Sequence, residues 1–123
     1  MDQFFPDDEK LFRAVYPPSH PGMFWKRDGS LSGAAFADPK GLSVNRRGDR
    51  TDAESVAIMK QTFQGSIVSL LVQDCRSAHA IVKHVPSRTN PYHSEIHQND
   101  QIALLSRTQR NHFAKHAVIE YMA

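Results

Sequence analysis

Two histidines and a glutamate alternate with other residues in NPYHSEIHQND, residues 90–100. On a β-strand, alternate side chains point to one face and lie about 6.5 to 7 Å apart, so His93, Glu95 and His97 would lie together. Two imidazoles and a carboxylate are a ligand set used by catalytic zinc and iron. A histidine beside a glutamate can also act as an acid or base. The pattern therefore marks His93 and Glu95 as catalytic candidates and all three residues as metal ligands.

The same alternation is also typical of a strand with one solvated face. In that interpretation Tyr92 and Ile96 face the interior and the two histidines stay in water, with no ion required. We favour this simpler interpretation. A metal or acid–base site would need the three side chains to converge in a concave site, whereas a solvated strand allows them to lie apart.

Other candidate catalytic residues lack the context that their chemistry needs. His112 and His116 are four residues apart, but Phe113 stands where a zinc protease has its glutamate. Ser43 has no GxSxG context, so a serine nucleophile is not indicated. Cys75 is the single cysteine, which excludes an internal disulfide and favours a packed thiol.

The clearest structural signal is the segment TDAESVAIMKQTFQG. Thr51 with Glu54 three residues later forms a capping box, and Gly65 follows the last turn. The spacing predicts a helix over residues 52–62.

Several short segments have the composition of strands. They are LFRAVY (11–16), AAFADP (34–39), GLSVNR (41–46), SIVSLLVQD (66–74), HAIVKHV (79–85) and YHSEIHQ (92–98). The segment 66–74 is apolar on both faces, which predicts a central strand, and a turn near DCRS would pair it with 79–85. Asn99 or Asp100 is expected to cap a final helix from Gln101, while AVIEYM could be a helical turn or a strand.

Composition fits one small folded domain. The chain has 123 residues, of which 40% are hydrophobic and 23% charged, and it lacks the roughly 18-residue apolar run that crosses a bilayer. We predict an N-terminal arm (1–10) and a single α+β domain (11–123), with a small, mostly antiparallel sheet, a central capped helix and a C-terminal helix. The acidic start lacks the features of a secretion signal, which favours a cytoplasmic protein with no membrane partner.

The segments LFRAV, SGAAFADPKGLSVNR and NPYHSEIH carry a resemblance. They resemble a group of small bacterial proteins with an S-x-A-A-F step, a G-L-S-V strand and a late N-P-x-H turn, over Leu11 to His97. The resemblance carries no activity with it, but it implies a bacterial or phage origin. Besides His93 and Glu95, the polar residues in its motifs are the ligand-binding candidates Arg13, Ser32, Ser43, Arg46 and Asn90.

The order of three polar residues is also similar to that of ADP-ribosyltransferase-like folds. Those folds use an early strand arginine or histidine, a middle serine or tyrosine and a late glutamate around a nicotinamide dinucleotide. Arg13, Ser43 and Glu95 occur here in that order. This resemblance implies a dinucleotide site formed by three separate segments.

The leading functional hypothesis is a binding or interaction module for a phosphate-bearing ligand, either a nucleotide or a nucleic acid. Its surface would combine the arginine-rich region 26–50 with the NPYHSEIH turn, although a net charge of +2 does not by itself indicate nucleic acid. The alternative is a small hydrolase or nuclease that uses His93, Glu95 and His97, with or without a metal. A protein partner is a third hypothesis, through an apolar patch at Phe4, Phe5 and Trp25. The sequence identifies no cofactor.

Overall fold

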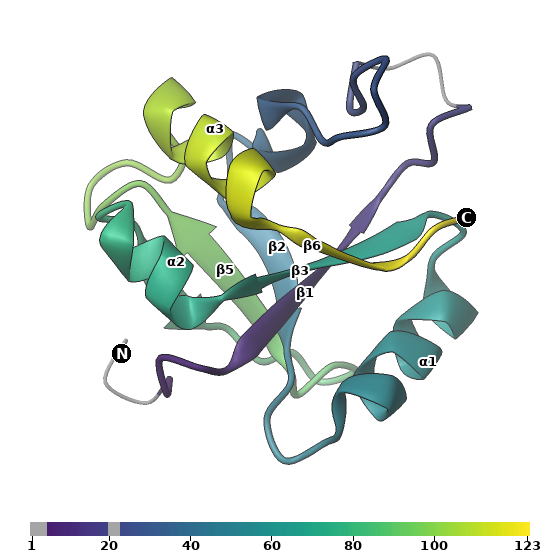
Figure 1. Cartoon of the computed structure of the whole chain (residues 1–123). Coiled ribbons are helices and arrows are strands. Elements are labelled where there is room, and N and C mark those ends of the chain that lie inside the picture. Colours follow the sequence, from purple (N-terminus) through teal and green to yellow (C-terminus); the bar gives the residue numbers. More distant parts are fainter. Residues whose placement is uncertain (1–4, 20–22) are drawn as a thin grey trace.

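The computed structural model describes residues 5–19 and 23–123, which form an α+β fold (Figure 1). One six-stranded antiparallel sheet carries three α-helices and a short 3₁₀ helix. In chain order the elements are β1 (Lys10–Val15), η2 (Gly33–Phe36), β2 (Leu42–Arg46), α1 (Asp52–Thr62), β3 (Ser66–Leu71), α2 (Val72–Ser77), β4 (Ile81–His84), β5 (His93–His97), α3 (Arg107–His116) and β6 (Val118–Tyr121). The predicted fold class is confirmed.

The sheet divides into two halves between β1 and β2. Its strand order is β4-β5-β2-β1-β3-β6. β1 pairs with β3 along its whole length, from Lys10 opposite Leu71 to Val15 opposite Ser66. Its pairing with β2, in contrast, is limited to Leu11 with Arg46 and Phe12 with Asn45. Beyond Phe12, β1 and β2 are no longer paired with each other. The site described below lies at the opening between these two strands.

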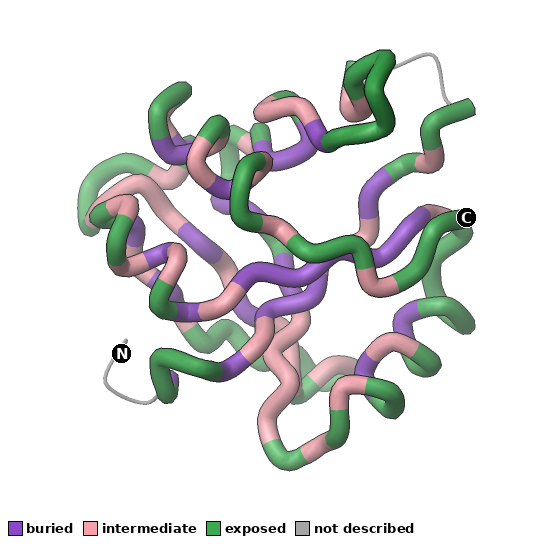
Figure 2. The backbone as a smooth tube through the Cα atoms, viewed as in Figure 1, coloured by how far each residue is buried: buried purple, intermediate pink, exposed green. Residues whose placement is uncertain are grey.

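The main core lies between one face of the sheet and the layer of α2, α3 and η2 (Figures 1 and 2). Phe36 of η2 meets Phe113 of α3 edge to face, with ring centroids 6.1 Å apart. The buried members from the strands include Leu11, Val15, Leu42, Val44, Val68, Leu70, Val82 and Ile96. Their alternation along each strand fixes which residues face the opposite side of the sheet.

On that opposite side, α1 packs against β1 and β3. Met59 closes a small second core over Phe12 and Ile67. The helix occurs where it was predicted, and both halves of its capping box are present: Thr51 N–H donates to Glu54 Oε1 and Glu54 N–H donates to Thr51 Oγ1. Because α1 lies over one half of the sheet, the same face of β2, β5 and β4 keeps a polar surface.

Two predictions about strands were wrong. Residues 34–36 form part of the 3₁₀ helix η2 rather than a strand, since the N–H groups of Ala35 and Ala37 bond back to Ser32 and Ala34. β3 pairs with β1 and β6 and not with β4, because the short helix α2 carries the chain away from it. The expected pairing of the segments 66–74 and 79–85 therefore does not occur.

The C-terminal helix also begins later than predicted. Asn99 Oδ1 accepts hydrogen bonds from the N–H groups of Gln101 and Ile102, which forms a turn and not a helix. α3 starts at Arg107, capped by a reciprocal pair between Ser106 and Gln109. The AVIEYM segment, for which two structures were open, contains strand β6.

The described part of the predicted N-terminal arm lies against the domain. Phe5 and Glu9 are both buried, whereas Phe4 lies outside the described residues. Cys75 is buried, in agreement with the expectation of a packed thiol. None of the helices in the described ranges has the length and apolar character needed to cross a bilayer.

Candidate ligand groove and polar sheet face

The uncovered half of the sheet presents a polar face built by strand register. Ser43 on β2 lies directly opposite Glu95 on β5, and Asn45 lies opposite His93. On the other side of Glu95, Lys83 of β4 is its register partner. Residues that oppose one another in an antiparallel pair have side chains on the same face, with Cβ atoms about 4.5 to 5.5 Å apart. Glu95 is therefore flanked by Ser43 and Lys83.

The histidines and the glutamate of β5 share this face, as the alternation predicts, while Ser94 and Ile96 are buried on the other side. His97 Nε2 lies 2.8 Å from Glu95 Oε1. His93 instead directs Nδ1 to the backbone carbonyl of Val85, at 3.0 Å. Among the residues that the structure describes, no three His, Cys, Asp or Glu side chains are arranged to hold a metal ion. Metal binding by this triplet stays a prediction.

Arg13 bridges the opening between β1 and β2. Its Nε donates to the carbonyl of Ala35 in η2 at 2.9 Å, and its Nη1 donates to the carbonyl of Ser43 in β2 at 3.0 Å. Burial lowers the pKa of Arg13, and the charge of Asp38 partly opposes that effect. A guanidinium stays protonated in proteins, so Arg13 carries a fixed positive charge into the opening.

Two adjoining hollows meet at Arg13, and we call them together the Arg13 groove. The larger is about 600 Å³ and the smaller about 320 Å³, and both are lined by Arg13, Ala14 and Phe63. The larger adds Val15, Tyr16, Pro17, Phe24, Ala35, Ala37, Gln64 and Gly65. The smaller adds Phe12, Ser43, Val44, Asn45, Met59, Asn90 and His93. The lining of both hollows is mainly apolar. We call the larger hollow the apolar end of the groove, and the smaller one, which carries the side chains of Ser43, Asn45, Asn90 and His93, the polar end.

The polar end of the groove is held in place by side-chain hydrogen bonds. Asn90 Nδ2 donates to Asn45 Oδ1 at 2.7 Å, and Asn90 Oδ1 accepts from the N–H of Tyr92. These bonds fix the turn before β5 against β2. The predicted ligand residue Asn90 therefore lies at the groove together with Arg13 and Ser43.

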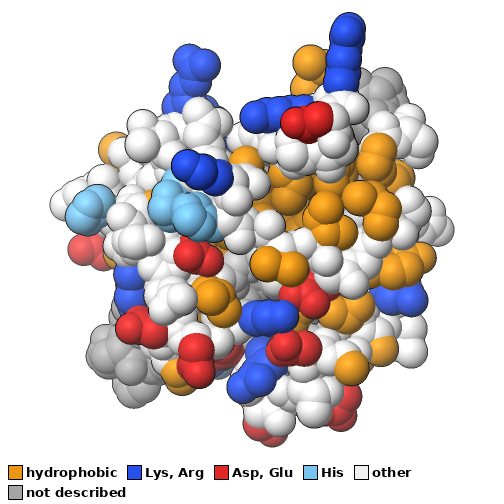
Figure 3. Space-filling model, viewed as in Figure 1, with side chains coloured by type: hydrophobic (Ala, Val, Ile, Leu, Met, Phe, Trp, Pro, Cys, Tyr) orange, Lys and Arg blue, Asp and Glu red, His pale blue; other side chains and the backbone are white. Residues whose placement is uncertain are grey.

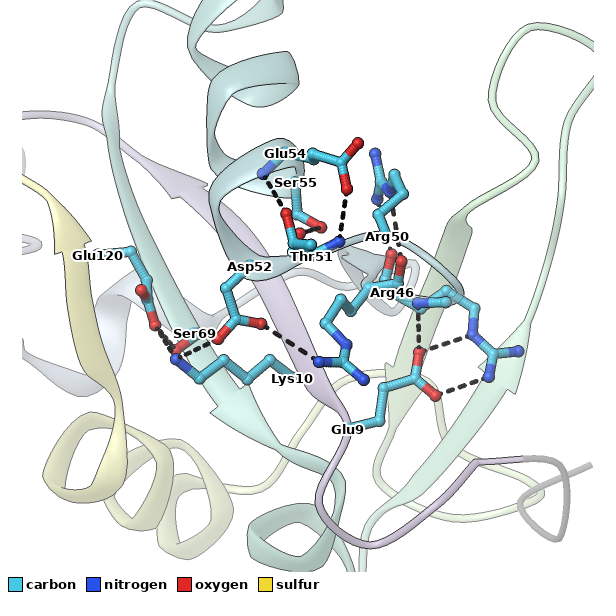
Figure 4. A network of polar contacts seen from close by, with 12 residues as sticks. Glu9, Lys10, Arg46, Arg50, Thr51, Asp52, Glu54, Ser55, Ser69 and Glu120 are labelled. Atoms are coloured by element: carbon cyan, nitrogen blue, oxygen red, sulfur yellow. Dashed lines mark hydrogen bonds and ion pairs between the residues drawn. The ribbon is translucent and has the colours of Figure 1, made fainter.

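The predicted ligand residues Ser32 and Arg46 do not line this groove. Ser32 Oγ donates to the carbonyl of Met23 in the preceding loop. Arg46 makes a two-pronged pair with Glu9 at 2.9 and 2.7 Å (Figure 4). Its guanidinium also lies over the Phe5 ring, 4.1 Å from the centroid. It belongs to a polar network that ties the 46–52 loop to β1.

That network is closed, in the sense that its carboxylates are paired with its own lysine and arginine side chains. Glu9 accepts from Arg46 and from the N–H of Gly48. Burial alone would raise the pKa of Glu9, but these hydrogen bonds and the charges of Arg46 and Arg47 lower the pKa overall. Farther along, Lys10 lies 2.8 Å from Glu120 and 3.1 Å from Asp52, and Glu120 holds the pKa of Lys10 above its usual range. Figure 4 shows both groups of contacts beside the start of α1.

Sequence reasoning missed the apolar end of the groove. Tyr16 and Phe24 lie there with ring centroids 5.6 Å apart, and Phe63 at the end of α1 contributes to both hollows. Phe24 also packs against the main core, as does Trp25. Figure 3 shows hydrophobic side chains gathered on the face seen in Figure 1. The one signal in the sequence was Phe63, an aromatic residue directly after the helix predicted over residues 52–62.

The comparisons with known proteins add no relative. No protein-family model matches the chain, and no curated protein or solved structure matches it either. The function is therefore argued from the groove itself.

Proposed function

We propose that the chain binds a nicotinamide dinucleotide in the Arg13 groove and breaks its glycosidic bond. One observation carries the proposal: Arg13, Ser43 and Glu95 lie on the neighbouring strands β1, β2 and β5, where Arg13 Nη1 donates to the carbonyl of Ser43 and Ser43 is the register partner of Glu95. This is the set of residues that the resemblance to ADP-ribosyltransferase-like folds implies around such a ligand. They are far apart in the sequence, and in the sheet β2 with Ser43 lies between β1 with Arg13 and β5 with Glu95.

Arg13 is suited to hold phosphate. Its two hydrogen bonds use Nε and Nη1, and Nη2 has no hydrogen bond to any described residue. Both of its acceptors are neutral backbone carbonyls, so no bonded carboxylate cancels the charge. A guanidinium fixed in this way loses little conformational freedom when a phosphate binds, and its planar N–H groups match phosphate oxygens.

The remainder of the groove suits the rings and sugars of a nucleotide. Ligand sites in proteins have volumes of about 300 to 1,000 Å³ and combine apolar walls with a few polar groups. Both hollows fall in that range. Tyr16, Phe24 and Phe63 offer surfaces for a planar ring, while Ser43 and Asn45 offer hydrogen-bonding groups for ribose.

Glu95 is the residue that would act on the sugar. It lies opposite Ser43, which lines the smaller hollow. When the bond between the ribose carbon and the nicotinamide nitrogen breaks, nicotinamide leaves with the bonding electrons and positive charge develops on the ribose. A carboxylate stabilises such a charge. Water or an acceptor hydroxyl then forms the new carbon–oxygen bond and loses its proton.

Two other functions receive less support. A nucleic-acid surface would use the arginines of the 46–50 loop, but Arg46 is paired with Glu9 and Arg50 lies over the Tyr92 ring at 3.6 Å. A metal-dependent hydrolase would need His93 to turn away from Val85 and His97 to leave Glu95. The dinucleotide proposal needs no such rearrangement.

The test combines calorimetric titration with NAD⁺ and chromatographic measurement of released nicotinamide. We expect the wild-type protein to bind NAD⁺ and release nicotinamide. Glu95→Gln should keep the affinity within about threefold and lower the release rate by at least about 100-fold, the scale of a lost catalytic group. Asp100→Asn, the same chemical change at an exposed position after β5, is the matched control and should leave both values unchanged.

The outcomes separate binding from chemistry. A wild-type protein that does not bind NAD⁺ at millimolar concentration would contradict the whole proposal. Binding without nicotinamide release would contradict the glycosidic step and leave the nucleotide site. A release rate that does not change in Glu95→Gln would exclude Glu95 as the acting carboxylate.

A further inference from the structure

His97 and Glu95 form a close pair on the polar sheet face. Their 2.8 Å contact joins His97 Nε2 to Glu95 Oε1, and the two side chains are only 15% and 24% exposed. Glu95 is a long side chain with three rotatable bonds on the face of β5 that α1 does not cover. The imidazole therefore restricts a carboxylate that the rest of the sheet does not enclose.

Gly41 leaves the space that this pair occupies. It directly precedes β2 and, by the register of Leu42 with Ile96, lies across from His97. A Cβ atom built on Gly41 would be 2.5 Å from His97 Nε2 and 3.1 Å from Glu95 Oε1. No side chain fits there without moving the pair, and the φ of +104° at Gly41 is itself one that favours glycine.

The turn that leads to Gly41 is also fixed. The N–H of Gly41 donates to the carbonyl of Asp38 at 3.1 Å, and the N–H of Lys40 donates to the Asp38 carboxylate at 3.0 Å. The DPKG turn therefore brings a residue without a side chain against the His97–Glu95 pair. Backbone geometry and side-chain contact, two separate observations, place Glu95 in one orientation.

We infer that His97 is a positioning residue that holds the carboxylate of Glu95 in one orientation on the polar sheet face, where Ser43 is its register partner, and that Gly41 makes this arrangement possible. The inference rests on the proposed function and assigns a role to two residues outside the Arg13, Ser43 and Glu95 set. With its proton on Nε2, the imidazole donates to Oε1 and leaves Oε2 for the ribose. His97 acts through Glu95 and does not touch the ligand.

The kinetic test compares His97→Ala, His97→Gln and Gly41→Ala with wild type in the nicotinamide-release assay. His97→Ala should lower kcat by about 10- to 100-fold, the effect of a small misplacement of a reacting group. The KM for NAD⁺ should change by less than about threefold, because Arg13 still binds the phosphates. His97→Gln keeps an N–H donor and should restore part of kcat.

The remaining variants separate positioning from folding. Gly41→Ala should lower kcat in the same way as His97→Ala, and thermal unfolding measures how much either variant loses in stability. His116→Ala, on the exposed face of α3, is the control and should leave kcat unchanged. A KM that rises while kcat stays constant in His97→Ala would overturn the positioning role.

A measurement independent of activity tests the contact itself. The ¹⁵N shifts of the His97 ring should show one tautomer with its proton on Nε2 in wild type, and a mixture of tautomers in Glu95→Ala. A ring that carries no proton on Nε2 would overturn the inference. A wild-type protein without nicotinamide release would reject the proposed function, and the ring shifts would still decide whether His97 holds Glu95.

Discussion

Two arginines on neighbouring strands have opposite surroundings. Arg46 makes a two-pronged ion pair with Glu9 and covers the Phe5 ring. Its hydrogen bonds and its charge are therefore directed to other residues of the protein. Arg13 is also held by two hydrogen bonds, but to neutral carbonyls at an opening in the sheet. The difference teaches that an arginine's partners, rather than its burial, decide whether it can bind an anion.

The largest expected effect is at the Glu9–Arg46 pair. Glu9→Ala leaves Arg46 buried without its carboxylate, and removal of one partner of a buried pair costs about 3 to 5 kcal/mol. The free energy of unfolding, measured by urea denaturation, should fall by that amount. Asp8→Ala, at an exposed neighbour, is the control and should change it by less than about 0.5 kcal/mol. Equal effects of the two variants would show that the Glu9–Arg46 pair does not stabilise the fold.

At Arg13 the expected effect is on the binding of NAD⁺. Arg13→Lys keeps the charge but cannot bond both carbonyls, so the affinity for NAD⁺ should fall by about 10- to 100-fold. The free energy of unfolding should fall by only about 1 kcal/mol, since the lost hydrogen bonds are to backbone carbonyls. Titration calorimetry and urea denaturation measure the two quantities. Arg88→Lys, on the exposed loop between β4 and β5, should change neither. An unchanged affinity would remove the distinction between the two arginines.

Low pH is expected to weaken the Glu9–Arg46 pair. Burial alone would raise the pKa of Glu9, but its contacts with Arg46 and Gly48 lower that pKa from its ordinary value of 4.5. A carboxylate with a lowered pKa contributes stability that is present above the ordinary value and lost as the pH falls through the folded value. We therefore expect the stability difference between wild type and Glu9→Gln to shrink as the pH falls below 4.5. Urea denaturation from pH 7 to pH 2.5 tests this, and a constant difference would contradict it.

A smaller effect is expected where the closed network meets α1. Thr51→Ala removes the side-chain half of the capping box and should lower the free energy of unfolding by about 1 kcal/mol. Thr51→Ser keeps the hydroxyl and should recover most of that loss. If Thr51→Ala also weakens NAD⁺ binding strongly, the helix and Phe63 at its far end shape the groove more than Arg13 does.

Local signals made part of the fold predictable. The Thr51–Glu54 capping box and the alternation from His93 to His97 each depend on residues within a few positions, and both predictions are confirmed. The start of α3 was harder to predict, because Asn99 forms a turn whose side-chain hydrogen bonds are the same as those of a helix cap.

Long-range pairing was not predictable from local patterns. Arg46 meets Glu9 across 37 positions, and nothing near either residue indicates the other. The neighbourhood of Arg13 and Ser43 depends on the strand order and on where β1 and β2 separate. The order of polar residues in the sequence suggested a shared site, but the two halves of the sheet had to be known before the groove could be described.

β3 is flanked by the first and the last strands of the sheet, and Lys10 bonds to Glu120 across 110 positions. During translation, one edge of β3 can find β1 early, while its other edge must wait until Tyr121 has left the ribosome. For that interval the nascent chain exposes one unpaired edge of a strand rich in isoleucine, valine and leucine, a surface on which a chaperone would act.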